Sequence, residues 1–419
     1  MSASPKSETI TDVPGAVPAP GRTRSSIEGR LLRRLLADLG DPAVEFVLWT
    51  GERAAPPGVA PAIRIRIADR GTLFRVLRDP QVQFPDAYSA GRIEVEGDLV
   101  QLIALIYRGM EAVDGRQTFG SRVARWFRRN PRNTLAGSRR NIHHHYDIGN
   151  EFYAMWLGET MAYTCAYYPN LAATLEQAQI AKMDHVCRKL QLQPGDHVVE
   201  AGCGWGGLAL HMASRYGARV RAFNISAEQI AYARERARRE RLDDRVEFVQ
   251  DDYRNISGRY DVFASVGMLE HVGRENYPEL GRVIRRSLGS AGRGLIHSIG
   301  RNRPGPLHPW ITRRIFPGAY APSLGEMMQI FEPSGLSVLD VENIRLHYAL
   351  TLRHWMDRYR AAEDRVRRMF DDTFVRMWRL YLAGSIAGFE TGTLQLFQVV
   401  FSTRENNQVA LTRQHQYAS

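Results

Sequence analysis

Cysteine is scarce in this 419-residue chain, which has only Cys165, Cys187 and Cys203. Three cysteines cannot build a disulfide framework and show no metal-ligand spacing, so we expect a reducing cytoplasm and no bound metal. Long apolar runs are also missing, since no segment approaches the roughly 18 apolar residues that a membrane-spanning helix needs. Residues 1–25 lack the apolar core of a secretory signal and are predicted to form a disordered, Pro/Ser/Thr-rich tail.

Acidic residues are missing from one segment, 121–145, which contains seven arginines together with Trp126 and Phe127. The whole chain has a net charge of +11, which favours anionic partners. Basic residues mixed with aromatics suit the surface of an anionic bilayer, although a solvated linker between domains explains the same residues equally well. Because the chain has no zinc module, RNP motif or basic zipper, we do not expect nucleic acid as a partner.

The rest of the composition, 44% hydrophobic and 24% charged, is that of a soluble globular protein long enough for two or three domains. After the tail, residues 26–113 are predicted to form a small α+β domain. Its expected helices are 27–39, 72–78 and 99–110, and its expected strands are 46–49, 62–67 and 92–97. Residues 114–138 form a basic linker, and 139–419 a larger domain.

The larger domain alternates between strand and helix patterns. Expected helices are 143–157, 175–192, 208–216, 227–240, 277–288, 350–368 and 372–389. Expected strands are 197–201, 219–224, 246–249, 260–265, 294–298 and 394–401. This alternation predicts an α/β fold with a mostly parallel, doubly wound sheet and helices on both faces. Ligands of such sheets bind beyond the carboxyl ends of the strands.

A glycine-rich loop follows the first strand of the larger domain, with the sequence V-V-E-A-G-C-G-W-G-G at 198–207. Its E-x-G-x-G-x-G spacing differs from the dinucleotide fingerprint G-x-G-x-x-G and is that of Rossmann-like enzymes that use S-adenosylmethionine (SAM). Glycine allows close backbone approach to a ligand, and the helix that follows offers free N–H groups. A glycine-rich turn without any ligand remains the alternative.

Other segments with chemically capable side chains lie at expected strand ends or helix starts. They contain Glu270 and His271 after one strand, His297 on another, Tyr163 and Cys165 in an aromatic loop, and Tyr348 at a helix start. A carboxylate next to an imidazole can bind or accept protons, but it can also simply pin a loop. A histidine on a strand and a dense aromatic segment are equally compatible with a structural core.

Taken together, these segments resemble the cyclopropane-fatty-acyl-phospholipid synthase family, which includes the mycolic acid cyclopropane synthases. The matching motifs are H-Y-D-I-G-N-E-F-Y at 145–153, Y-T-C-A-Y-Y at 163–168, A-G-C-G-W-G-G at 201–207, S-V-G-M-L-E-H-V-G at 265–273, H-S-I at 297–299 and H-Y-A-L-T-L-R-H-W at 347–355. I-F-P-G-A-Y at 315–320 and L-Q-L-F-Q-V-V-F at 394–401 match as well. The resemblance covers about residues 140–405 in order and in spacing, which makes it far more specific than the glycine loop alone.

The resemblance implies a SAM-dependent methyltransferase fold for 139–419 and a lipid-associated N-terminal domain. It implies methyl transfer from SAM to the cis double bond of a phospholipid acyl chain, with a carbocation that is deprotonated by a bound bicarbonate ion. By match, the bicarbonate ligands are Cys165, Glu270, His297, Tyr348 and the backbone of Ile299. The tyrosines at 163, 167 and 168 are expected to face a cation, because ring faces stabilise positive charge.

The resemblance also implies the residues that hold SAM. They are Tyr163, Thr164, Glu200, Gly202, Gly204, Trp205, Gly206, Asn224, Ile225, Gln229, Tyr253 and Arg254. The expected partners are unsaturated phospholipids at an anionic membrane surface and a second copy of the chain. The expected location is the cytoplasmic face of the cell membrane, bound peripherally.

Three alternatives to cyclopropane formation stay open. The same methyl transfer can end in a methylene- or methyl-branched fatty acid if the cation loses its proton elsewhere. The acyl substrate can be soluble or carrier-bound. The chain can also be a lipid-binding protein without catalysis, although the intact glycine loop and the base-holding residues argue against that.

Overall fold

The computed structural model describes residues 26–114 and 148–417. The predicted tail, the basic linker apart from Asp114, and residues 145–147 of the first family motif lie outside the described residues.

The N-terminal part is built on a four-stranded sheet with the order β2-β1-β3-β4. Its elements are α1 (Ile27–Asp38), β1 (Val44–Val47), β2 (Arg53–Ala54), β3 (Ile63–Ile67), α2 (Arg70–Arg78), α3 (Pro80–Ser89), β4 (Ile93–Glu96) and α4 (Leu99–Asp114). Strand β3 shows why the sheet forms: Ile63, Ile65 and Ile67 are buried, while Arg64 and Arg66 alternate with them and bond to Glu96 on β4. Sequence reasoning missed α3, because proline usually breaks helices; Pro80 is tolerated in the first turn, where its missing N–H is not needed.

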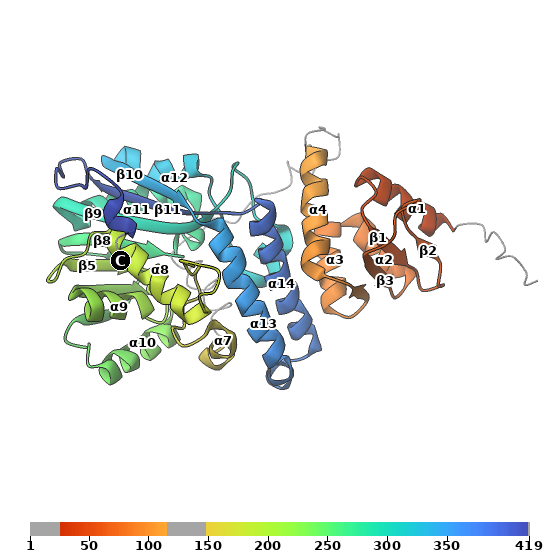
Figure 1. Cartoon of the computed structure of the whole chain (residues 1–419), viewed down its shortest axis with the longest axis horizontal. Helices are drawn as coiled ribbons and strands as arrows, with labels where there is room; N and C mark the ends of the chain where they lie inside the picture. Colours follow the sequence, from red (N-terminus) through yellow and green to blue (C-terminus); the bar gives the residue numbers. More distant parts are fainter. Residues whose placement is uncertain (1–25, 115–147, 418–419) are drawn as a thin grey trace, which may run out of the picture.

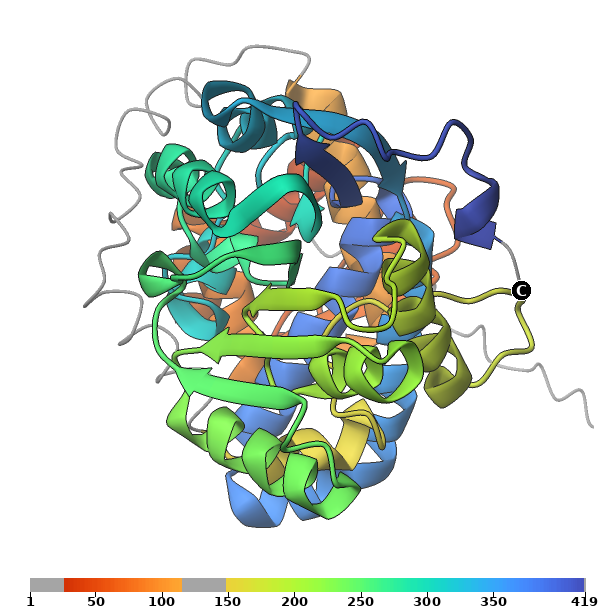
Figure 2. The ribbon, with the colours of Figure 1, turned by 90° about the vertical axis from the view of Figure 1, so that its left-hand side faces the viewer.

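The larger part is built on a seven-stranded sheet with the order β10-β11-β9-β8-β5-β6-β7. Its strands are β5 (His197–Ala201), β6 (Arg219–Asn224), β7 (Val246–Gln250), β8 (Tyr260–Val266), β9 (Leu288–Gly300), β10 (Leu336–Asn343) and β11 (Gln395–Thr403). Strands β5 to β9 pair in parallel, and β11 runs antiparallel between β9 and β10. The predicted mostly parallel sheet is therefore confirmed, and Figure 2 shows its strands edge to edge.

Helices cover both faces of this sheet (Figure 1). They are α7 (Asn150–Leu157), α8 (Leu175–Lys189), α9 (Gly207–Tyr216), α10 (Ala227–Glu240), α11 (Tyr277–Ser287), α12 (Leu324–Phe331), α13 (Arg345–Met369), α14 (Asp372–Thr391) and α15 (Gln414–Tyr417). Neighbouring residues of β5 show the two faces: Val198 packs with α8, α9 and α10, and Val199 packs with α11 and α12. The sheet is thus doubly wound, as predicted.

Several boundaries and elements differ from the prediction. Helix α7 begins at Asn150, and its N-cap Gly149 has a positive φ of 95°. Residues 143–147 of the expected helix lie outside the described residues. Helix α13 begins at Arg345, so that Tyr348 falls in its first turn. Strand β10 and helix α12 were not predicted; β10 is an edge strand that leaves Val338 and Leu339 exposed, so it lacks the alternation on which strand prediction depends.

Helix α14 packs against α13 on one side and against α3 and α4 on the other, and so joins the two parts (Figure 1). Asp86 on α3 fixes this arrangement by accepting hydrogen bonds from Trp310 Nε1 at 3.0 Å and from Arg314 at 2.8 Å. On α14, Arg376 donates to the backbone carbonyls of Tyr88 and Ile93. Within the described ranges, no helix combines the length and apolarity needed to cross a bilayer.

Candidate active site

The glycine loop joins β5 to α9, and its glycines at 202, 204 and 206 all have positive φ. A side chain at Gly202 would collide with Cβ of Met268 at 2.7 Å. At Gly204, in contrast, a Cβ would meet no atom within 4 Å. The loop therefore needs glycine to fold, and at Gly204 it leaves open space against bare backbone, the kind of cradle that a ligand can approach closely.

Glu200 is the second-last residue of β5, just before this loop, and only 2% of it is exposed. Burial raises the pKa of its carboxyl to about 7, and the positive charge of Lys182 opposes that rise. Its Oε2 is buried and has no hydrogen-bond partner among the described residues. A buried carboxylate oxygen without a partner is costly, so Glu200 fits a role of receiving a donor group from a ligand.

Asn224 and Gln229 meet each other beside the glycine loop, as predicted for one site. Asn224 Nδ2 donates to Gln229 Oε1 at 2.7 Å and to the Gly204 carbonyl at 3.3 Å. Asn224 ends β6, Ile225 follows it in the turn, and Gln229 lies in the first turn of α10. The parallel pairing of β5 with β6 is what brings their carboxyl ends together.

Trp205 anchors the loop to α7 rather than standing free beside it. Its Nε1 donates to Asn150 Oδ1 at 2.7 Å, and its ring lies 5.1 Å from that of Tyr153. Tyr163 belongs to the same aromatic cluster, with its ring 5.2 Å from Trp156 and its hydroxyl 2.8 Å from that of Tyr381.

The other two tyrosines expected to face a cation lie elsewhere. The ring of Tyr167 is stacked between those of His185 and His347, at 4.2 and 4.6 Å. The ring of Tyr168 stacks on that of His354 at 5.7 Å. Both faces of the Tyr167 ring are thus occupied by histidines, which corrects the expectation for Tyr167. The expectation for Tyr168 stays a prediction.

Glu270 follows β8, and its Oε1 accepts a hydrogen bond from the backbone N–H of Ile299 at 2.6 Å. Burial raises the pKa of this carboxyl to about 7, and the Ile299 bond works against the rise. Its second oxygen, Oε2, is buried and has no hydrogen-bond partner within the described ranges. Glu270 and Ile299, which are predicted to serve the same ion, are therefore in direct contact.

His297 lies on β9, two residues before Ile299, and is buried. Its Nδ1 lies 3.1 Å from Gln398 Nε2, an amide nitrogen that can only donate, so Nδ1 accepts. Burial, followed by the charge of Lys182, lowers the pKa of His297 to about 3, so the ring is neutral and its proton is on Nε2. His297 is therefore set up as a hydrogen-bond donor through Nε2.

Cys165 and Tyr348 are linked indirectly, through a contact between the Cys165 loop and α13. The Ala166 N–H donates to Thr351 Oγ1 at 3.0 Å, which ties the Cys165 loop to the start of α13, where Tyr348 lies. Burial raises the pKa of the Cys165 thiol far above its ordinary value, so the thiol stays protonated. The structure thus groups Glu270, His297 and Ile299 at the end of the sheet, and Cys165 and Tyr348 beside α13.

Tyr253 and Arg254 follow β7 and lie against α11. Arg254 bonds to Asp252 at 3.1 Å and its backbone carbonyl accepts from Arg286 on α11. Their contact with a cofactor stays a prediction.

Sequence reasoning missed Gln179 and Lys182, which lie one turn apart on α8 and are both buried. Lys182 Nζ donates to Thr164 Oγ1 at 3.0 Å, and Gln179 Nε2 donates to the Thr164 carbonyl at 2.9 Å. A signal was present in the sequence: polar residues recur at 179, 182, 185 and 189, a helical spacing on a helix whose other buried residues are largely apolar.

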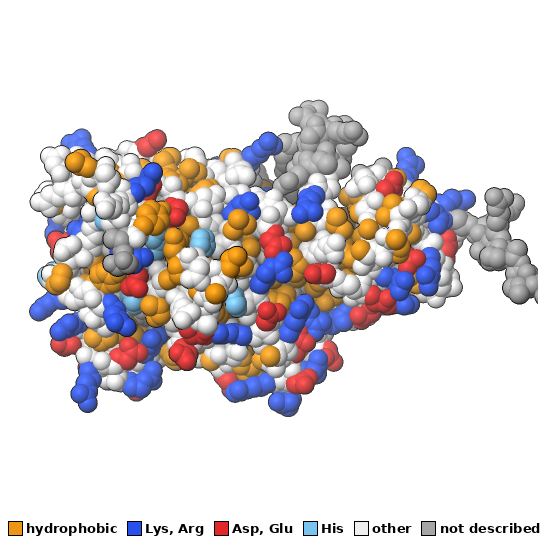
Figure 3. Space-filling view, viewed as in Figure 1, with side chains coloured by type: hydrophobic (Ala, Val, Ile, Leu, Met, Phe, Trp, Pro, Cys, Tyr) orange, Lys and Arg blue, Asp and Glu red, His pale blue; other side chains and the backbone are white. Residues whose placement is uncertain are grey.

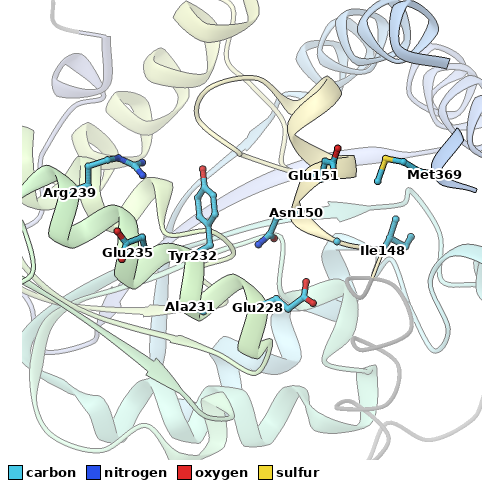
Figure 4. A pocket seen from close by; sticks show the side chains of 10 residues that line it. Ile148, Asn150, Glu151, Glu228, Ala231, Tyr232, Glu235, Arg239 and Met369 are labelled. Carbon is cyan, nitrogen blue, oxygen red and sulfur yellow. The ribbon is translucent and has the colours of Figure 1, made fainter. Parts of the chain in front are cut away.

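A pocket of about 630 Å³ opens beside the glycine loop, between the start of α7 and the outer face of α10. Figure 4 shows Tyr232 rising from α10, with Asn150 to its right at the start of α7. None of the predicted site residues lines this pocket. The pocket adjoins the glycine loop through Asn150, which bonds to Trp205. We assign no catalytic or cofactor-binding role to this pocket.

The chain belongs to the mycolic acid cyclopropane synthetase family, whose model matches residues 134–399. Residues 31–115 match a separate domain family of unknown function. The protein is therefore a SAM-dependent methyltransferase of the cyclopropane-fatty-acyl-phospholipid synthase type, as the motifs predicted.

Relatives with different names cover much of the chain. A probable fatty acid methyltransferase of Pseudomonas putida is 35% identical over 84% of this chain and 90% of its own. The cyclopropane-fatty-acyl-phospholipid synthase of Escherichia coli is 40% identical over 64% of this chain and 69% of its own. The tuberculostearic acid methyltransferase of Mycobacterium tuberculosis is 34% identical over 89% of this chain and 90% of its own.

Among solved structures, a mycolic acid cyclopropane synthase complexed with SAH and CTAB superposes with a TM-score of 0.61 at 26% identity. That match covers 66% of this chain and 99% of the other. The unpartnered Oε2 of Glu200 and the open backbone at Gly204 fit the methyl donor that this class of enzyme uses.

Proposed function

We propose that this protein methylates the cis double bond of an unsaturated phospholipid acyl chain and closes a cyclopropane ring. SAM supplies the methyl group, and a bicarbonate ion supplies the base when it is bound. The residues proposed to hold that ion are Cys165, Glu270, His297, Tyr348 and the backbone of Ile299. The name of the Escherichia coli relative, which states both the phospholipid and the cyclopropane product, supports this proposal.

The environment of Glu270 is the observation that carries the proposal. One of its carboxylate oxygens is fixed by the Ile299 N–H, and the other is buried without a partner. An anion that bears a hydroxyl group, such as bicarbonate, would donate the missing hydrogen bond to Oε2. His297 Nε2–H and the Cys165 thiol are neutral donors suited to the remaining oxygens.

The protonation states of these residues also suit the proposed chemistry. The alkene carbon bonds to the methyl carbon while the carbon–sulfur electron pair stays on sulfur, which leaves positive charge on the acyl chain. The new methyl group then loses a proton, and its C–H electron pair closes the ring. Because Cys165 is a thiol and Nδ1 of His297 is engaged by Gln398, neither is a free nucleophile that the sulfonium would alkylate.

The test is expression in a bacterial host that makes unsaturated phospholipids and no cyclopropane fatty acids. Fatty acid methyl esters would be identified by mass spectrometry and by the NMR signals of the ring methylene. We expect cyclopropane acids with the wild-type chain and none with Glu270→Gln. A lipid profile that the wild-type chain leaves unchanged contradicts the proposal.

A second candidate product is a methylene- or methyl-branched fatty acid. The observation that favours it is the match to tuberculostearic acid methyltransferase, which extends over 89% of this chain and includes the N-terminal part. The same lipid analysis separates the two, because an olefinic or branched product has no ring methylene.

We also propose that the protein is a homodimer that binds peripherally to an anionic membrane. On the face seen in Figure 3, Lys and Arg side chains are interspersed with Asp and Glu, so this part of the proposal rests on the basic segment 121–145. Sedimentation with anionic and zwitterionic liposomes, together with light scattering, tests it. Turnover of soluble acyl substrates without liposome binding would favour a soluble or carrier-bound substrate.

A further inference from the structure

Lys182 is a buried lysine, 2% exposed, that projects from α8 toward the loop carrying Thr164 and Cys165. Its one hydrogen bond in the described structure runs from Nζ to Thr164 Oγ1 at 3.0 Å. An ammonium group has three donor hydrogens, and burying it with only one partner is unfavourable unless an anion or an acceptor is nearby.

Helix α8 holds Thr164 at two points. Gln179, one turn before Lys182, donates to the Thr164 backbone carbonyl at 2.9 Å. Lys182 holds the hydroxyl of the same residue. The position and the side-chain orientation of Thr164 are therefore both set by α8.

The Lys182 contact also determines which way the Thr164 hydroxyl acts. An ammonium group can only donate, so Oγ1 accepts from it, and the hydrogen of the hydroxyl is left to be donated elsewhere. The Thr164 hydroxyl can therefore donate to an acceptor group of a ligand. In SAM, the carboxylate of the amino-acid end is the acceptor that also gains from a nearby positive charge.

Glu200 supplies the opposite charge at the same site. The pKa of Glu200 responds to the charge of Lys182, and the pKa of Lys182, lowered to about 8 by burial, responds to Glu200. The free Oε2 of Glu200 needs a donor, and the α-ammonium of an amino acid is one. A buried lysine and a buried glutamate that each influence the other's pKa give a charge pattern complementary to an amino-acid zwitterion.

We infer that Lys182 is a positioning residue that recognises the amino-acid end of the methyl donor. Its ammonium directs the Thr164 hydroxyl to the carboxylate of SAM, while Glu200 receives the α-ammonium. This inference rests on the proposed assignment of Thr164 and Glu200 to SAM, and it does not depend on the lipid product.

Binding calorimetry on the full chain tests it with two ligands that differ only in the carboxylate: SAM and decarboxylated SAM. We expect the wild-type chain to bind SAM about 10- to 100-fold more tightly, the range for charge-assisted hydrogen bonds. Lys182→Met keeps the length of the side chain and removes its charge. The Lys182→Met variant should bind SAM more weakly than wild type by a similar factor, and its affinity for decarboxylated SAM should change less than about twofold.

Lys189→Met is the matched control, since Lys189 is also buried on α8 but its Nζ contacts Glu342 at 2.5 Å. It should lower the melting temperature and keep the preference for SAM. Thr164→Val should also lose the preference for SAM over decarboxylated SAM, and adding Lys182→Met to Thr164→Val should change that preference little. If Lys182→Met does not fold, Thr164→Val supplies the test by itself. The inference is overturned if Lys182→Met lowers the affinities for SAM and decarboxylated SAM equally, or if it leaves the preference for SAM undiminished.

Discussion

The carboxylate of Glu270 and the backbone N–H of Ile299 meet at 2.6 Å, although 29 positions separate them in the chain. The contact exists because β8 and β9 pair in parallel and end at the same edge of the sheet. It leaves the other oxygen of Glu270 facing the proposed base site.

Glu270→Gln should therefore reduce turnover by about 100-fold or more, the usual contribution of a residue that serves proton transfer. The affinity for SAM, measured by calorimetry, should stay within about twofold, because the glutamine keeps the Ile299 bond and the cofactor residues are untouched. Glu45→Gln is the control: Glu45 is equally buried but lies on β1 of the other sheet, so turnover should not change. Loss of SAM binding in Glu270→Gln would contradict the assignment of Glu270 to the base side.

The raised pKa of Glu270 also predicts a pH dependence of stability. With a pKa of about 7 in the folded state against 4.5 ordinarily, the folded chain holds a proton that the unfolded chain has lost. The resulting stability is fully present below pH 4.5 and is lost as pH rises through 7.

Glu270→Gln lacks this titration. Its free energy of unfolding, relative to wild type, should thus rise across that window by up to about 3 kcal/mol, at roughly 1.4 kcal/mol per pKa unit. Thermal unfolding of both proteins at several pH values measures it. A difference that is constant with pH counts against the raised pKa.

Asn150 holds the glycine loop through the Trp205 indole, at 2.7 Å. Asn150→Ala should remove the acceptor that Asn150 gives to the buried Trp205 indole and cost about 1–3 kcal/mol of stability. Because the same indole fixes the loop, SAM affinity should fall by about five- to tenfold, a loss of order 1 kcal/mol. Asn150→Asp retains an acceptor and should recover most of the stability and most of the SAM affinity. Unchanged SAM binding in Asn150→Ala would show that the loop does not need this anchor.

Asp86 links the N-terminal part to the segment around Trp310 and Arg314. Asp86→Ala should lower turnover on phospholipid vesicles several-fold and leave SAM affinity within about twofold, because the contact lies away from the glycine loop. Asp69→Ala is the control: it removes the N-cap of α2 and should cost about 1 kcal/mol of stability without affecting turnover. Equal effects of the two variants on turnover would argue against a role for this interface.

Local patterns predicted much of the larger domain. Strands β5 and β6 and helix α10 have the predicted bounds, since each combines a clear apolar period with a turn or a capping residue. Strand β10 and helix α3 escaped prediction, because an exposed edge strand and a proline-containing helix carry no such period. The separation of Tyr167 and Tyr168 from Tyr163 also escaped, because it depends on histidines supplied by α8 and α13.

The sequence by itself determined the class of this protein, because the glycine loop, the strand-end residues and their order are local and specific. Only the tertiary structure decided which side chains meet. The bond between the hydroxyls of Tyr163 and Tyr381 joins residues 218 positions apart, and Lys182 reaches Thr164 across a loop. Such contacts arise when helices pack on a sheet, and a periodicity along one segment cannot specify a partner on another.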